Sequence, residues 1–154
     1  MRRGESGVTL IEIAVVLVVV ALLAVAIFPA LGNVLEIMRS KGAAEEVASA
    51  IRLARQYAIT RGNDHCITFS GSPNTKFTIY QDAACTSVVP GHTDQEIGHG
   101  FAIVNPANLS IVFTPVGNVA PPATVTLQVD TSPAVCLSSV LVTLFGGVRV
   151  TYGC

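Results

Sequence analysis

The amino-acid sequence predicts an α+β fold in which one long N-terminal α-helix packs on a small antiparallel β-rich head. Residues 13–31 contain no charged or strongly polar residue, and an apolar pattern with helical spacing continues to about residue 61. After residue 63, short alternating or β-branched segments follow, separated by Gly and Pro. With 154 residues, the chain has room for one head of modest size.

The apolar run of residues 13–31 is long enough to cross a membrane, and we expect the membrane span to cover about residues 8–31. As a helix, its 19 residues would span ~28 Å, close to the ~30 Å hydrocarbon core of a bilayer. Arg2 and Arg3 precede the run and would stay in the cytoplasm under the positive-inside rule, so the head should lie across the membrane. A secretory signal peptide is the alternative, but a helical pattern follows the run instead of a mature start.

Glu12 is an acidic residue at the start of this apolar segment. A carboxylate in hydrocarbon costs about 2–3 kcal/mol or more unless it is paired. Glu12 should therefore either meet a cation or lie at the headgroup boundary, and the residues alone leave both interpretations open. Pro29 and Gly32, later in the segment, would either kink the helix or simply be tolerated, as both are in membrane helices.

The next segment, residues 32–62, is predicted to be an amphipathic stalk. Its apolar residues recur at i, i+3 and i+4, and that stripe should pack on the head. Arg52 and Arg55 lie away from the stripe and are interpreted as its solvated side. Gly62 begins a stop signal, so the helix should end at about residue 61. The apolar stripe comprises Ala44, Val47, Ala48, Ile51, Ala54 and Ala58.

The head, residues 63–154, is predicted to consist of antiparallel strands. Turn residues separate most of the predicted strands, and residues 82–100 are expected to form a longer polar loop. The expected strands are residues 66–69, 77–80, 110–113, 124–127, 140–145 and 148–151.

All four cysteines follow the apolar segment, and they lack the spacing of zinc ligands. Disulfides in an oxidising compartment are therefore expected, in agreement with the inferred topology. Pairing of Cys66 with Cys85 and of Cys136 with Cys154 is favoured, and each bond would close a loop of roughly twenty residues worth ~3 kcal/mol. Crossed pairings remain open.

The remaining polar residues give little indication of catalysis or metal binding. The segment from His92 to His99 could ligate a divalent cation, but a solvated loop is the preferred interpretation. Nine basic against ten acidic residues do not favour nucleic-acid binding. The sequence contains no nucleotide-binding loop, serine elbow or metalloprotease motif. We expect a non-enzymatic protein with no cofactor and no metal.

The N-terminus resembles the signal of type IV pilins and pseudopilins, because Gly7 is followed by Val8, then Thr-Leu-Ile and Glu12, after a short basic leader. The resemblance implies that residues 1–7 are a leader, that a prepilin peptidase cuts between Gly7 and Val8, and that Val8 is N-methylated. It also implies that Glu12 pairs with the N-terminal amine of a neighbouring subunit, where each charge offsets the other's desolvation. Phenylalanine is commoner than valine at the first mature position.

The rest of the chain resembles the GspH/FimT family. The resemblance rests on residues 53–61, residues 66–69, Phe-Thr-Pro-Val-Gly at 113–117 and Gly-Val-Arg-Val at 147–150. It implies a minor pseudopilin of type II secretion or a minor pilin of a type IV pilus, anchored in the bacterial inner membrane with a periplasmic head. Its partners would be other pilins of the filament, the prepilin peptidase and an inner-membrane assembly platform.

Two other functions remain as alternatives. Some FimT-like proteins bind DNA through a C-terminal Gly-Arg-x-Arg motif, but Gly147 occupies the first arginine position here and only Arg149 remains. One arginine offers few phosphate contacts, so DNA uptake is the less favoured function. The second alternative is a plain membrane anchor that displays a small binding domain.

Overall fold

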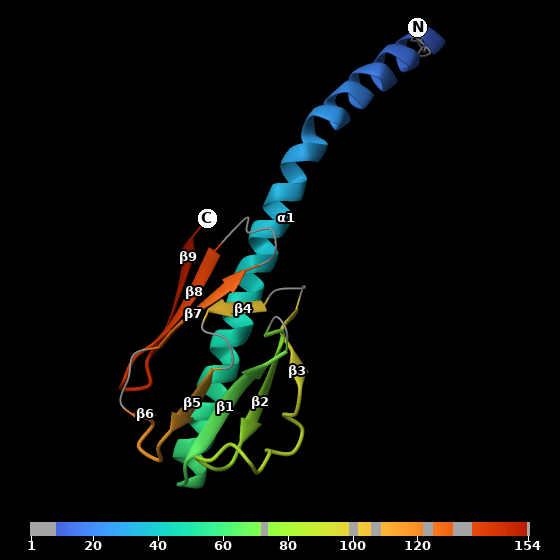
Figure 1. The fold of residues 1–154 in the computed structure, drawn as a ribbon. Helices are drawn as coiled ribbons and strands as arrows, with labels where there is room; N and C mark the ends of the chain where they lie inside the picture. Colours follow the sequence, from blue (N-terminus) through green and yellow to red (C-terminus); the bar gives the residue numbers. More distant parts are fainter. Residues whose placement is uncertain are drawn as a thin grey trace, which may run out of the picture. The chain divides into compact units, whose positions relative to one another are not determined.

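The computed structural model of the protein describes residues 9–71, 74–98, 102–105, 109–121, 125–130 and 137–153. The chain divides into two compact units, Met1–Leu35 and Glu36–Cys154. Helix α1, Leu10–Arg61, supplies the described part of the first unit and continues into the second (Figure 1). Its 52 residues agree with the long helix predicted from the apolar pattern.

The C-terminal end of α1 is defined by a glycine cap. Gly62 has a φ of 69°, a left-handed conformation that glycine adopts without a Cβ penalty, and its N–H donates to the carbonyl of Ala58 at 3.1 Å. Arg61 lies in the last turn, where a cation interacts favourably with the helix dipole. The helix therefore ends at Arg61, where the stop signal that begins at Gly62 predicted.

The predicted apolar stripe of α1 packs on the head. All six of its residues are fully buried, and four of them are alanines, whose small side chains allow strands to approach the helix closely. The stripe belongs to one core cluster that also contains side chains from both sheets of the head. The sheet residues with the largest buried side chains are Ile67, Ile79, Ile103, Ile111, Phe113 and Leu127.

The head contains two antiparallel sheets, which lie alongside the C-terminal part of α1 (Figure 1). The first sheet has the order β3-β2-β1-β5-β6 and the second has the order β4-β7-β8-β9. The strands of the first sheet are β1 (His65–Ser70), β2 (Lys76–Tyr80), β3 (Gln95–Glu96), β5 (Ser110–Phe113) and β6 (Val119–Ala120). Those of the second are β4 (Ala102–Asn105), β7 (Val125–Asp130), β8 (Leu137–Val142) and β9 (Val148–Gly153).

Two sequence-based expectations about the head were wrong in detail. Strand β8 ends at Val142, and the residues that follow it turn toward β9 instead of extending the strand to residue 145. The segment 82–100 is not simply a polar loop, because it contributes β3 and buries Val89 and Ile97. These two apolar side chains bind the segment to the core.

A disulfide joins Cys66 in β1 to Cys85, which lies after β2. The two Cα atoms are 5.5 Å apart, and the bond closes a loop across a sequence separation of 19 residues. This is one of the two pairings favoured from the sequence. Cys136 and Cys154 lie outside the described residues.

Candidate assembly surface

The N-terminal part of α1 presents an apolar surface to its surroundings. The helix begins after Thr9, whose carbonyl accepts hydrogen bonds from the N–H groups of Glu12 at 3.1 Å and Ile13 at 3.3 Å. Large apolar side chains from Leu10 to Val25 are exposed, several of them by more than two thirds. A contiguous apolar surface of this kind marks a contact with lipid or protein.

Glu12 lies exposed in the first turn of α1, surrounded by that apolar surface. A carboxylate near a helix N-terminus interacts favourably with the helix dipole. Within the described part of the chain, the one ion pair joins Arg52 to Glu45, so Glu12 has no charged partner there. Gly7 and Val8, the predicted processing site, lie outside the described residues.

Among the residues that the structure describes, no helix is both long enough and apolar enough to cross a membrane.

The predicted span of residues 8–31 includes residue 8 and the side chains of residues 26–31, which are outside the description. The backbone at Pro29 and Gly32 is helical and belongs to α1. Their role as kink sites stays a prediction.

At the other end of α1, two hairpin turns of the head have the same construction. Thr114 and Thr143 each donate their N–H to the carbonyl four residues later, and each hydroxyl oxygen accepts from the N–H of that same later residue. Gly117 and Gly146 occupy equivalent positions with φ of 85° and 73°, and each donates its N–H to the threonine carbonyl. The β5–β6 and β8–β9 turns are thus two copies of one five-residue turn.

Arg55 joins these two turns to the helix. Its Nε donates to the carbonyl of Gly117 at 2.9 Å, and its Nη2 donates to the carbonyl of Phe145 at 3.3 Å. The turns also touch each other, since a Cβ added to Gly146 would lie 2.0 Å from the Gly117 carbonyl oxygen. Arg55 is therefore not simply part of the solvated side of α1, because it holds two hairpins from different sheets together.

Other polar residues of α1 also contact the head. Glu46 accepts a hydrogen bond from the N–H of Gly98 at 2.8 Å. Glu45 accepts one from the Tyr152 hydroxyl at 2.6 Å, and this bond to a carboxylate raises the pKa of Tyr152. Lys41 lies 5.4 Å from the centre of the same tyrosine ring. The two contacts of Tyr152 attach strand β9 to the helix.

The sequence from His92 to His99 is partly integrated into the head. His92 is half-buried, and its Nε2 lies 3.1 Å from the hydroxyl of Tyr57 on α1. Tyr57 has two further ring contacts: the His65 ring stacks on it, and the Arg61 guanidinium lies 4.8 Å from its ring centre. The structure thus assigns His92 a packing contact with the helix, and His99 lies outside the described residues.

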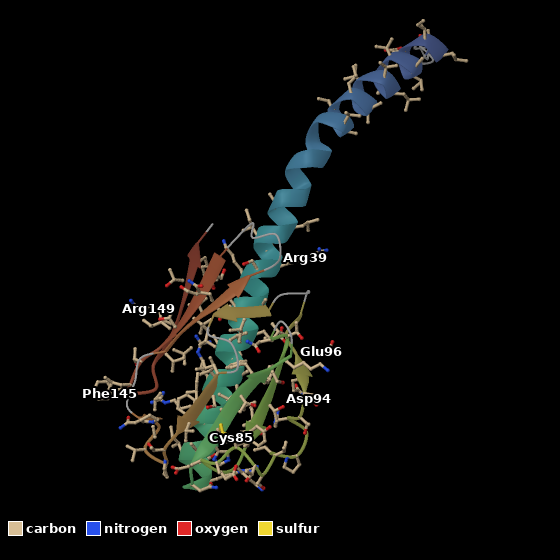
Figure 2. All side chains as sticks on the ribbon, in the orientation of Figure 1. Arg39, Cys85, Asp94, Glu96, Phe145 and Arg149 are labelled. Carbon is tan, nitrogen blue, oxygen red and sulfur yellow. A yellow bond between two sulfur atoms is a disulfide. The ribbon has the colours of Figure 1, made fainter. Side chains whose placement is uncertain are left out.

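Arg149, which occupies the second arginine position of the Gly-Arg-x-Arg pattern, lies exposed on β9 opposite Leu141 of β8. Figure 2 shows Arg149 on the same side of the head as Phe145. A Cβ added to Gly147 would lie 2.9 Å from the Thr143 hydroxyl oxygen, which bonds the Gly147 backbone. An arginine at position 147 would therefore require this turn to rearrange.

A long N-terminal helix with an exposed apolar first part, packed on antiparallel sheets through its second part, defines a pilin-like fold. Two family models match the sequence: "Type II transport protein GspH" over residues 43–142 and "Prokaryotic N-terminal methylation motif" over residues 2–28. The chain belongs to the GspH family, and it is a minor pilin or pseudopilin that assembles with other pilins in a membrane-anchored filament.

Solved structures share the fold. The type IV minor pilin FimU of Pseudomonas aeruginosa matches with a TM-score of 0.59 and 16% identity over 72% of this chain and 91% of its own. The minor pseudopilin EpsH from the Type 2 Secretion System of Vibrio cholerae matches with a TM-score of 0.56 and 16% identity, over 74% of this chain and 97% of its own. No curated protein sequence matches significantly.

Proposed function

We propose that a prepilin peptidase cleaves the chain between Gly7 and Val8, that Val8 is methylated, and that Glu12 then sets the position of the subunit in the filament. The match to the N-terminal methylation motif over residues 2–28 supports the processing step. The observation that carries the role of Glu12 is its location as a lone carboxylate within an exposed apolar helix surface.

The physical reason for this role is the cost of desolvation. When helices pack side by side in a filament, the apolar surface around Glu12 becomes buried and its carboxylate loses water. An N-terminal amine of the adjacent subunit offsets this cost, because it pairs with the buried carboxylate. Removing one partner of a buried ion pair costs about 3–5 kcal/mol, since the other charge is then buried without a partner. A pair of this kind also selects one axial register between two helices, which uniform apolar contacts do not.

The same proposal includes location and partners. The chain would be a single-pass protein of the inner membrane with a periplasmic head, and the prepilin peptidase and assembly platform would act on it there. The Cys66–Cys85 disulfide supports an oxidising compartment for the head. The filament is either a type II secretion pseudopilus or a type IV pilus.

The N-terminal mass of the full chain, co-expressed with a prepilin peptidase, tests the processing step. We expect wild type to begin at methylated Val8 and Gly7→Ala to retain the leader. A wild-type chain that keeps residues 1–7 would leave a plain membrane anchor as the better interpretation.

Incorporation into sheared filaments tests the role of Glu12. Glu12→Gln should be cleaved normally yet enter filaments at least about tenfold less, because the neighbouring amine then lacks a charged partner. Glu96→Gln is the control, since Glu96 is an exposed carboxylate on strand β3 of the head. Equal incorporation of both variants would rule out the proposed pairing.

A further inference from the structure

Four exposed apolar side chains gather at the two linked hairpins of the head. Val116 and Phe145, at the tips of the two turns, are 78% and 69% exposed, and Leu144 precedes Phe145 in its turn. Ile59 of α1 lies beside them, because its Cδ1 would be 2.8 Å from a Cβ added to Gly117. We call Ile59, Val116, Leu144 and Phe145 the tip patch.

The tip patch is a concentration of apolar surface, not a scatter of single residues. Within the described residues of the unit Glu36–Cys154, the large apolar side chains that are exposed number six, and four of them form this patch. The other two are Met38 and Tyr152, and the Tyr152 hydroxyl is bound to Glu45. Because the other described large apolar side chains of this unit, apart from Met38 and Tyr152, are buried or half-buried, an exposed group of this kind indicates an interaction site.

The patch is also rigid. Both turns are closed by the same set of threonine and glycine hydrogen bonds, and Arg55 donates to a carbonyl of each turn. Gly146 and the Gly117 carbonyl are in backbone contact. The two apolar tips are therefore held in one arrangement before any partner binds, which reduces the ordering cost of binding.

A positive charge adjoins the patch. Arg55 is half-buried between the turns, and the two hydrogen bonds described above use two of its five N–H donors. In the part of the chain that the structure describes, no carboxylate pairs with Arg55, whereas Arg52 one turn away pairs with Glu45. The guanidinium can therefore accept a carboxylate from a partner, which would neutralise a cation next to buried apolar surface.

We propose that the tip patch docks a neighbouring subunit of the same filament, on a surface with an apolar groove and a carboxylate at its rim. The two exposed tips fit a concave partner, and the charge of Arg55 favours an acidic one. A patch of four side chains is small compared with stable interfaces between free proteins, which bury about 1,200–2,000 Å². A filament lifts that requirement, because it holds its subunits side by side at high effective concentration.

Site-specific photo-crosslinking in cells tests this proposal on the full chain, expressed with the other subunits of its filament. A benzophenone amino acid would replace Val116 or Phe145 in separate variants. Matched controls carry it at Asp94 or Glu96, which are exposed on the side of the head away from Phe145 (Figure 2). We expect the two patch positions, and not the controls, to form an adduct with another filament subunit, identified by mass spectrometry.

Two substitutions separate the apolar contribution from the charge. With the probe at Val116, Phe145→Ser should reduce the adduct about tenfold or more, as expected for an aromatic anchor in an interface. Arg55→Gln should also reduce it, and intact Cys66–Cys85 disulfide and protease resistance would show that the head is folded. If Arg55→Gln unfolds the head, Phe145→Ser alone decides.

The outcomes distinguish this inference from the proposed function on which it rests. Adducts with a secreted protein or with DNA in place of a filament subunit would overturn it, as would equal adduct yields at Asp94 and Phe145. If the leader is cleaved and the chain enters filaments but the patch positions give no adduct, the docking surface is wrong and the filament role stands. If the leader is not cleaved, the filament role itself fails.

Discussion

Replacing Gly146 with alanine should destabilise the head by ~2–5 kcal/mol, because two independent costs add. Gly146 has a φ of 73°, and an L-residue in this left-handed conformation costs about 1–2 kcal/mol. The new Cβ would lie 2.0 Å from the Gly117 carbonyl oxygen, a backbone atom that cannot rotate away. The two hairpins must then separate, and Arg55 loses one or both of its carbonyl hydrogen bonds, worth about 1–3 kcal/mol together at this partly exposed site.

Comparison with Gly91→Ala isolates the second cost, which is the loss of contact between the hairpins. Gly91 has a φ of 84°, so the left-handed penalty is the same, but no atom lies within 4 Å of a Cβ added there. Pulse proteolysis of the full chain across a urea series measures both variants. With about 1–2 kcal/mol per M of urea, the second cost of about 1–3 kcal/mol should lower the midpoint of Gly146→Ala roughly 0.5–3 M further than that of Gly91→Ala. Equal midpoints for the two variants would refute a tight contact between the hairpins.

Three further predictions concern single contacts of the head. Cys85→Ser should lower the free energy of unfolding by ~3 kcal/mol under non-reducing conditions and change little once wild type is reduced, as urea midpoints with and without reductant will show. Tyr152 has a pKa raised above 10.0 by its hydrogen bond to the Glu45 carboxylate, so the stability from this bond is fully present below pH 10.0 and is lost as pH rises through the raised value. Urea midpoints measured across pH should therefore show wild type losing stability relative to Tyr152→Phe only in that alkaline range. Asp82 has a pKa below 3.8 because the Thr86 hydroxyl and nearby N–H groups donate to it. The extra stability of wild type over Asp82→Asn, measured by urea midpoints, should be present above pH 3.8 and disappear as pH falls through the lowered value.

Local patterns predicted the helix and most strands because the forces that form them are local. The alanine-rich stripe of α1 has helical periodicity, and its six residues are all fully buried. Strands β1, β2, β5 and β9 contain enough β-branched or aromatic residues to be recognised without a partner. The short strands β3 and β6, with two residues each, gave no such signal because pairing with a longer neighbour creates them.

The role of Arg55 was not predictable from its position on the helix. The two carbonyls that Arg55 binds lie 62 and 90 residues away in the sequence. Helical periodicity placed Arg55 on the polar side of α1 but contains no information about such distant acceptors. The prediction of a strand to residue 145 was wrong for a related reason. Thr143, Leu144 and Phe145 favour a strand by composition, but Gly146 and the Thr143 hydrogen bonds impose a turn.

The repeated turn has a consequence for how such a subunit can diversify. Its geometry depends on the threonine that opens it and the glycine at its fourth position, whereas the two residues between them face outward. Pro115-Val116 and Leu144-Phe145 can therefore be exchanged, or replaced altogether, while the scaffold below them is conserved. In this respect the head resembles a binding scaffold with two short variable loops on a constant frame. If the tip patch docks a partner as proposed, a library confined to these four positions would change its specificity without redesigning its fold.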